Sequence, residues 1–313
     1  MFIYEEIYRG LLYMYFPYFR GKQYELMALR GLVEKKLISK RVIPIIEPIK
    51  FSTQFIKTVK TFINSKRKIV IIHNPQVGEY PAVLNSHDER FINLLANENV
   101  IVGHIVNSNS KEELELLKEI GVKLDNLLVI NNNNELYEET FKENEPKYIV
   151  VPGYGRPGDK NIILQDKFNK QKRNADYGEE PELFSYEHII YDANKYCGFS
   201  DYSLVGSNYT TGGGPAYAIA LHILYYNKEN ILYVRHFVSD SKDGSKNQKG
   251  KFLEAVGKFS SWLESNKKYH TYAINELLNY YNMKHYPGAG MIKKLSIMHH
   301  LEIMSRYLEK KCK

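Results

Sequence analysis

Three short runs of apolar, mostly β-branched residues begin a repeating pattern: VIPIIEPI (42–49), KIVIIH (68–73) and VIVGHIV (100–106). Each run is followed by a stretch that we expect to be helical, at 53–64, 88–96 and 110–120. Ser110 and Glu113 have the spacing of a capping box, which marks a helix start. Continuous apolar strands that alternate with helices of about ten residues are typical of a parallel sheet covered on both faces.

The strand–helix unit recurs on both sides of these runs. LLVI (127–130) precedes a predicted helix at 134–144, and KYIVV (147–151) precedes a loop rich in glycine and proline. A strand is expected at 15–19, and further strands at 162–165 and 202–206 would complete the set. So many units favour a closed (βα)-barrel-like parallel sheet, with a doubly wound open sheet as the alternative.

The pattern changes after the predicted barrel. Residues 216–226 and 231–238 flank a short polar turn and predict a β-hairpin, although 216–226 is also compatible with a barrel helix. Helices are expected at 250–265, 271–281 and 291–310. We therefore predict a barrel-like domain over 14–249 that includes the hairpin near 216–238, and C-terminal helices over 250–313 that pack on it. Residues 1–13 are predicted to be an added N-terminal extension, and the long polar segment 167–196 to be a functional excursion.

Composition excludes several protein classes. The chain has 313 residues, a net charge of +7 and two cysteines. Two cysteines make neither a disulfide framework nor a four-cysteine zinc site. With no long apolar run, we expect a soluble, cytoplasmic protein that does not contact a membrane. The positive charge permits contact with nucleic acid, although solvated helix faces are its more ordinary explanation.

In a barrel, reactive groups lie at the C-terminal ends of strands. We predict Glu47, His73 and Asp166 as the catalytic residues. Glu47 stands in an apolar strand and needs a buried partner, for which Lys22, Lys50 and Arg20 are candidates. A general acid–base role and a structural ion pair both remain open for it. His73 and His104, with Glu47 and Asp166, form a candidate ligand set for a divalent metal.

Ligand-binding residues are predicted around the same strand ends. The densest polar stretch is DKFNKQKRNADY (166–177), whose cations suit phosphate groups. The glycine-rich stretch SNYTTGGGP (207–215) permits close approach of a ligand to the backbone but matches no nucleotide-binding motif. The predicted ligand-binding residues are Arg20, Lys22, Glu25, Lys50, Arg173, Asn174, Asp176 and His236.

Six strings, in this order, resemble the beta-protein family of bacteria and satellite phages: YFPYFRGKQYELMAL (15–29), IPIIEPIK (43–50), DKFNKQKRNADY (166–177), GFSDY (198–202), GGPAYAIALH (213–222) and RHFVSD (235–240). The similarity is to the branch encoded beside a smaller partner gene, and it spans the chain from Met14 onward. The resemblance implies a role in anti-phage defence and a partner protein encoded nearby. It implies no reaction.

Three functions follow as hypotheses. The first is an enzyme-like barrel that binds or acts on a phosphate-bearing ligand, a nucleotide or nucleic acid, as a hydrolase of phosphate esters would. The second is a non-catalytic sensor or regulator that binds a phage component or a partner protein through the hairpin and the C-terminal helices. The third is a nucleic-acid-binding protein that works by charge alone, which requires one continuous positive face.

Overall fold

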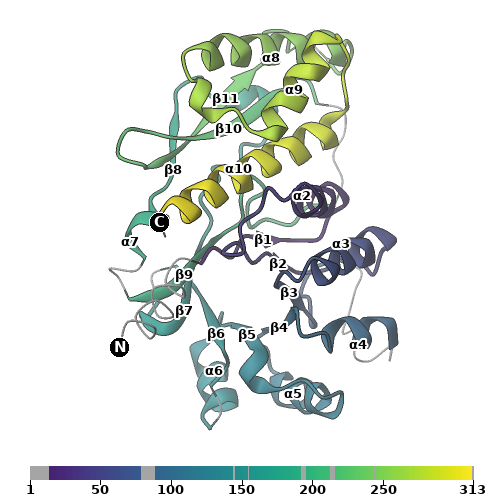
Figure 1. The fold of residues 1–313 in the computed structure, drawn as a ribbon, viewed down its shortest axis with the longest axis vertical. Helices are drawn as coiled ribbons and strands as arrows, with labels where there is room; N and C mark the ends of the chain where they lie inside the picture. Colours follow the sequence, from purple (N-terminus) through teal and green to yellow (C-terminus); the bar gives the residue numbers. More distant parts are fainter. Residues whose placement is uncertain are drawn as a thin grey trace.

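The structure, a computed structural model, describes residues 14–78, 89–143, 145–153, 155–191, 195–211, 216–242 and 244–311. Its main body is a nearly closed barrel of parallel strands (Figure 1), which confirms the predicted fold class. Neighbouring strands pair in the order β1 (Tyr18–Phe19), β2 (Ile45–Ile46), β3 (Ile69–Ile72), β4 (Val100–Ile105), β5 (Leu127–Ile130), β6 (Tyr148–Pro152), β7 (Gly158–Gln165) and β9 (Tyr196–Asp201).

The segment before β1 closes the barrel. Tyr15 forms bridges both with Val42, before β2, and with Phe199 in β9. The strand predicted at 202–206 is wrong, because the eighth strand is β9, which ends at Asp201. Its apolar pattern is interrupted by Gly198, where a Cβ would lie 2.9 Å from the carbonyl oxygen of Met14. The backbones at the seam pack so closely that position 198 requires a glycine. This glycine, in a strand with the sequence YCGFSD, is why the strand was not recognised.

Five helices follow the first five strands, as the repeating unit predicts: α2 (Gln23–Glu34), α3 (Thr53–Asn64), α4 (Glu89–Leu95), α5 (Ser110–Glu119) and α6 (Asn134–Phe141). Ser52 and Asn133 cap α3 and α6 by accepting a backbone N–H. Short 3-10 turns occupy Leu124–Asn126, Asn174–Asp176 and Lys267–Tyr269. Between β6 and β7 the described residues form no helix, and a short loop returns the chain to the start of β7.

A second, antiparallel sheet lies beside the barrel in the order β10 (Ala220–Tyr226), β11 (Leu232–Val238), β8 (Glu182–Ser185). The pairing of β10 with β11 confirms the predicted hairpin. The polar segment 167–196 supplies β8 and the short helix α7 (Glu187–Ile190), neither of which was predicted. This excursion links the barrel to the small sheet.

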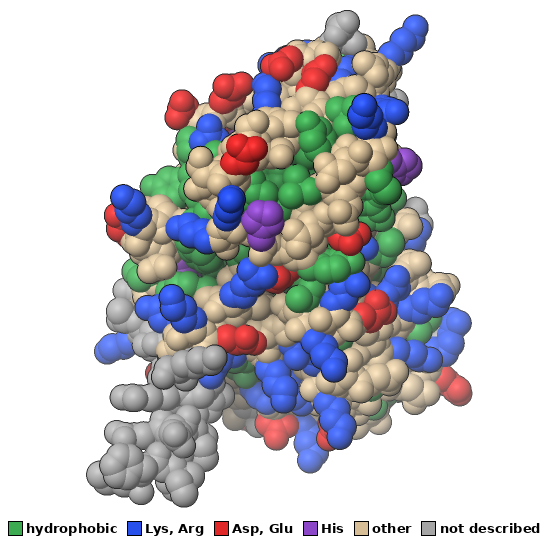
Figure 2. All heavy atoms as spheres, turned by 45° about the horizontal axis from the view of Figure 1, so that its top comes forward, with side chains coloured by type: hydrophobic (Ala, Val, Ile, Leu, Met, Phe, Trp, Pro, Cys, Tyr) green, Lys and Arg blue, Asp and Glu red, His purple; other side chains and the backbone are tan. Residues whose placement is uncertain are grey.

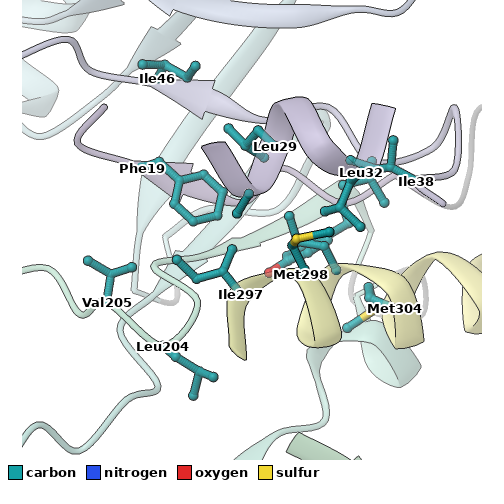
Figure 3. Close-up of a cluster of buried hydrophobic side chains, with 14 of the residues drawn as sticks. Phe19, Leu29, Leu32, Ile38, Ile46, Leu204, Val205, Ile297, Met298 and Met304 are labelled. Atoms are coloured by element: carbon teal, nitrogen blue, oxygen red, sulfur yellow. The ribbon is translucent and has the colours of Figure 1, made fainter. Parts of the chain in front are cut away.

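The C-terminal helices are α8 (Gln248–Glu264), α9 (Tyr272–Asn282) and α10 (Ala289–Lys311). In Figure 1, α10 runs between the barrel and the small sheet. Figure 3 shows Ile297 and Met298 of α10 in the cluster that contains Phe19 and Leu29. His300 lies against the Tyr15 ring, with centroids 5.8 Å apart, so α10 covers the barrel seam. The predicted extension at residues 1–13 lies outside the described residues.

The alternation of the barrel strands decides which side chains face inward. Val70, Ile72 and Ile101 belong to the cluster that fills the interior, whereas Ile71 and Val102 pack on the helices. By the same alternation, residues 73 and 104 face outward and residue 47 faces inward. Among the described residues, no helix is long and apolar enough to cross a membrane.

Candidate functional site

Glu47 lies fully buried at the C-terminal end of the barrel interior. Its Oε2 accepts a hydrogen bond from the Tyr18 hydroxyl at 2.7 Å, and its Oε1 accepts one from the backbone N–H of Gln76 at 2.7 Å. Arg20 forms an ion pair with Oε2. Arg20 is therefore the partner that the buried carboxylate requires.

Arg20 connects Glu47, through Ser207, to Asp166. Its second terminal nitrogen donates to the carbonyl oxygen of Ser207 at 2.8 Å, and the Ser207 N–H donates to Asp166 at 2.8 Å. The guanidinium also lies over the ring of Tyr202, 5.6 Å from its centroid. Glu47 and Asp166 thus belong to one network, in which Glu47 is fully occupied by protein groups. This arrangement favours a structural ion pair that closes the barrel.

Several predicted ligand-binding residues are engaged in local structure. Glu25 is buried at the start of α2, where its carboxylate accepts from the backbone N–H groups of Arg20 and Lys22. Arg173 and Asp176 pair with each other on the surface at 3.1 Å. Lys50 is exposed at the end of the β2 segment.

The structure does not bring His73 to Glu47 and Asp166. Both His73 and His104 face away from the barrel interior, and they contact each other at 2.9 Å between Nε2 and Nδ1. The metal ligand set of these histidines with Glu47 and Asp166 is therefore not assembled. The carboxylate that lies beside them is Glu113, from α5.

A cavity of about 440 Å³ lies between the 168–177 segment, the small sheet and the starts of α8 and α10. Its wall combines amines, amides and aromatic rings. Asn174, a predicted ligand-binding residue, is part of this wall and donates to the carbonyl oxygen of Ala218 at 2.9 Å. The other polar and aromatic lining residues are Phe168, Lys170, Gln171, Lys172, Tyr177, His222, Gln248, Tyr286, Lys293 and Ser296.

The charge around this cavity is positive. Lys170 and Lys172 come from the polar stretch, and Lys293 comes from α10. Burial lowers the pKa of neighbouring Lys22, and the charges of Lys293 and Lys170 lower it further, against the opposing effect of Glu25. Lys293 is already paired with Glu25, with 3.4 Å between Nζ and Oε1, so the repulsion that a bound anion would relieve lies mainly between Lys22 and Lys170.

A row of titratable side chains lies behind the cavity, one from each strand of the small sheet. His222 of β10 stands directly opposite His236 of β11, and their Nδ1 atoms are 2.8 Å apart. His236 Nε2 lies 3.4 Å from a carboxylate oxygen of Glu182 in β8. Burial lowers the pKa of His222 to about 3, with a smaller contribution from His236. His222 is therefore neutral near pH 7.

Sequence reasoning included His236 but missed His222, Glu182 and Lys293. The predicted hairpin contained a usable signal, because pairing its strands around the 227–230 turn sets His222 opposite His236. No signal pointed to Lys293, which reaches the cavity from a distant helix.

The face in Figure 2 has Lys and Arg side chains interspersed with Asp and Glu, so this face is not continuously positive. No family model matches the chain, and no curated protein matches it.

Proposed function

We propose that the cavity binds a phosphate-bearing ligand and that a nucleotide is the class that fits best. The observation that carries this proposal is the meeting of three lysines with aromatic rings in one cavity of about 440 Å³. Lysine amines act as point charges for phosphate. Tyr286 is half-buried and offers a surface on which a base can stack, next to the buried, mutually stacked rings of Phe168 and Tyr177. The volume lies in the range of small-molecule sites.

We propose further that the site hydrolyses a phosphate ester. Water attacks phosphorus and gives a proton to His222, the P–O ester bond breaks, and His222 returns the proton to the leaving oxygen. His236 contacts His222 Nδ1 and lies 3.4 Å from Glu182, so these two residues hold the His222 ring in place, as the orienting member of a triad does. The lysines stabilise the negative charge that develops on phosphate oxygens.

Binding is tested with a panel of fluorescent nucleotides and with inorganic phosphate as competitor. We expect Lys170→Ala and Lys293→Ala each to weaken binding at least tenfold, and binding to fall as salt rises. The matched control is Lys60→Ala, which removes an exposed lysine of α3 that is not part of the cavity wall. Equal affinities in all variants would contradict the proposed site.

Hydrolysis is tested separately by phosphate release. His222→Asn should abolish turnover and leave nucleotide binding in place, since it removes the proton acceptor and keeps the lysines. If the wild-type protein binds nucleotides but releases no phosphate from any of them, the site is a binding site without a reaction.

The resemblance to the beta-protein family supports a further proposal, that the protein is a component of anti-phage defence and works with a partner protein. A phage-challenge assay of the gene with its neighbours tests it. Loss of protection in His222→Asn and Lys170→Ala would support a catalytic role in defence, whereas full protection in all variants would exclude a role for the cavity.

The alternative is a non-catalytic sensor that contacts a partner through the small sheet. Leu183 is 52% exposed and Tyr217 is 61% exposed, and these apolar groups lie on or just before strands of that sheet. Exposed apolar side chains of this kind serve as contacts for a partner. Loss of protection in Leu183→Ser and Tyr217→Ser, with His222→Asn still protective, would favour the sensor.

A further inference from the structure

A second group of chemistry-bearing side chains lies outside the barrel, at the C-terminal ends of β3 and β4. His73 and His104 follow or end these neighbouring strands, and Glu113 comes from the first turn of α5, which follows β4. One nitrogen of each histidine and one carboxylate oxygen of Glu113 all lie within 4.8 Å of one another. The cavity described above uses none of these residues.

We propose that His73, His104 and Glu113 form a zinc site, with the fourth position open to water. Two imidazoles and one carboxylate are a common protein ligand set for a zinc ion that keeps an open coordination position. Hard cations such as Mg²⁺ and Ca²⁺ take oxygen ligands instead, so imidazole nitrogens select against them.

The distances fit tetrahedral coordination. With metal–ligand bonds of about 2.0–2.2 Å, ligand atoms of a tetrahedral site lie about 3.3–3.5 Å apart. His73 Nε2 is 2.9 Å from His104 Nδ1, and His104 Nδ1 is 3.8 Å from Glu113 Oε2. These two distances fall on either side of the required value, and all three ligand atoms lie within 4.8 Å of one another, so side-chain rotations must bring them around one ion.

The surrounding groups hold the ligands as an outer shell would. The other ring nitrogen of His104, Nε2, hydrogen-bonds with Ser110 Oγ at 2.8 Å. Glu113 Oε2 accepts from the side-chain amides of Asn74 at 2.6 Å and Asn107 at 3.0 Å. Fixing the far nitrogen of a histidine is how outer-shell groups orient metal ligands, whereas Glu113 Oε2 must exchange one of its amide hydrogen bonds for the ion.

Asn74 connects these outer-shell groups to strand β4 of the barrel. Its side-chain oxygen accepts from the backbone N–H of Ile105 at 2.9 Å, and its amide nitrogen donates to the carbonyl oxygen of the same residue at 2.9 Å. That nitrogen is also 3.3 Å from His104 Nδ1. The ligand side chains are therefore placed by two strands and a helix start, which is the rigidity that a metal site needs.

A route for the ion is also present. Both histidines are buried, whereas the Glu113 side chain is 18% exposed and provides the route for the ion. A bound ion would join β3, β4 and α5 and so stabilise this side of the barrel.

The test uses the full chain after dialysis against a chelator. We expect calorimetric titration with zinc chloride to give one ion per chain and thermal scanning to show a rise in Tm of several degrees, because a ligand that binds the native state stabilises it. Magnesium and calcium chlorides should produce neither effect. Glu113→Gln should weaken zinc binding at least tenfold, since it removes the ligand charge.

Glu112→Gln is the matched control, because it removes an exposed carboxylate one residue away on the same helix. Absence of stoichiometric zinc binding, or equal binding in both glutamine variants, would overturn the proposal and leave the group as a hydrogen-bonded network. If Glu113→Gln fails to fold, cobalt replaces zinc in the wild-type protein. A tetrahedral Co²⁺ visible spectrum supports the site, and an octahedral spectrum overturns it.

Discussion

Replacement of Glu47 by glutamine distinguishes the two roles that a carboxylate can have at the barrel mouth. The substitution keeps the shape and removes the charge that Arg20 faces in a buried position. Removing one member of a buried ion pair costs about 3–5 kcal/mol because the other charge stays buried. Arg20 is 13% exposed and also donates to Ser207, so the lower figure of about 3 kcal/mol applies. In a protein of 313 residues that corresponds to a fall in Tm of about 4–5 °C.

The assay is urea unfolding of a double-mutant cycle: wild type, Glu47→Gln, Arg20→Gln and the double variant. We expect the double variant to be less destabilised than the sum of the single variants, since no unpaired charge remains. Tyr18→Phe is the control, because it removes one hydrogen bond to Glu47 and should cost roughly 1 kcal/mol. A Glu47→Gln protein as stable as the wild type, with nucleotide binding lost, would refute the structural role and make Glu47 a ligand-binding residue.

Two further substitutions test the seam and the interior of the barrel. Burial is the main cause that raises the pKa of Asp201 from 3.8 to about 6, against hydrogen bonds from Tyr15 and Ser203 that lower it. A carboxyl whose pKa is higher in the folded state destabilises that state as pH rises through about 4 to 6. The difference between the two pKa values corresponds to about 3 kcal/mol of unfolding free energy. Asp201→Asn should therefore raise the free energy of unfolding by up to about 3 kcal/mol relative to the wild type at pH 7.5 and by little at pH 4. Urea unfolding at both pH values measures this difference. An increase of equal size at both pH values would show that the charge of Asp201 is not its cause. Gly103→Ala would place a Cβ inside the barrel, 2.8 Å from Ile72 Cγ1 and 3.2 Å from Ile72 Cα. We expect this crowding to lower the free energy of unfolding by about 1–3 kcal/mol. Thermal unfolding measures this loss with Gly178→Ala as the control, since a Cβ at Gly178 meets nothing within 4 Å; equal Tm values would contradict the packing argument.

The repeating part of the fold could be predicted because most of the barrel strands carry a run of apolar, largely β-branched residues, with the aromatic strand at 15–19 as the exception. The strand β8 could not be predicted, because ELFS (182–185) is short and stands in a polar segment with no alternation. It becomes a strand because β11 offers it a free edge, as the pairing of Val234 with Glu182 shows. The pairing with β11, which cannot be seen in the sequence, therefore makes residues 182–185 a strand.

The candidate site was less predictable for a related reason. A strand that is apolar on both faces gives no sign of which face is inside, so Glu47 and His73 looked equivalent as strand-end residues. The structure separates them, with Glu47 inside the barrel and His73 outside. Glu113 was assigned to a capping box with Ser110, but its carboxylate contacts Asn74 and Asn107. The prediction placed Glu113 correctly in the first turn of a helix. Its hydrogen bond with Asn74 could not be predicted, because Asn74 lies in the loop after the preceding strand, β3.

The position of α10 has a consequence for how the chain acquires its fold during synthesis. All eight barrel strands leave the ribosome before α10 does, and at about 5–20 residues per second this delay lasts several seconds. During that interval Tyr15 at the seam lacks its contact with His300 of α10. The seam of the nascent barrel is therefore completed only when α10 docks. Detachment of α10 from the folded protein would expose the same seam.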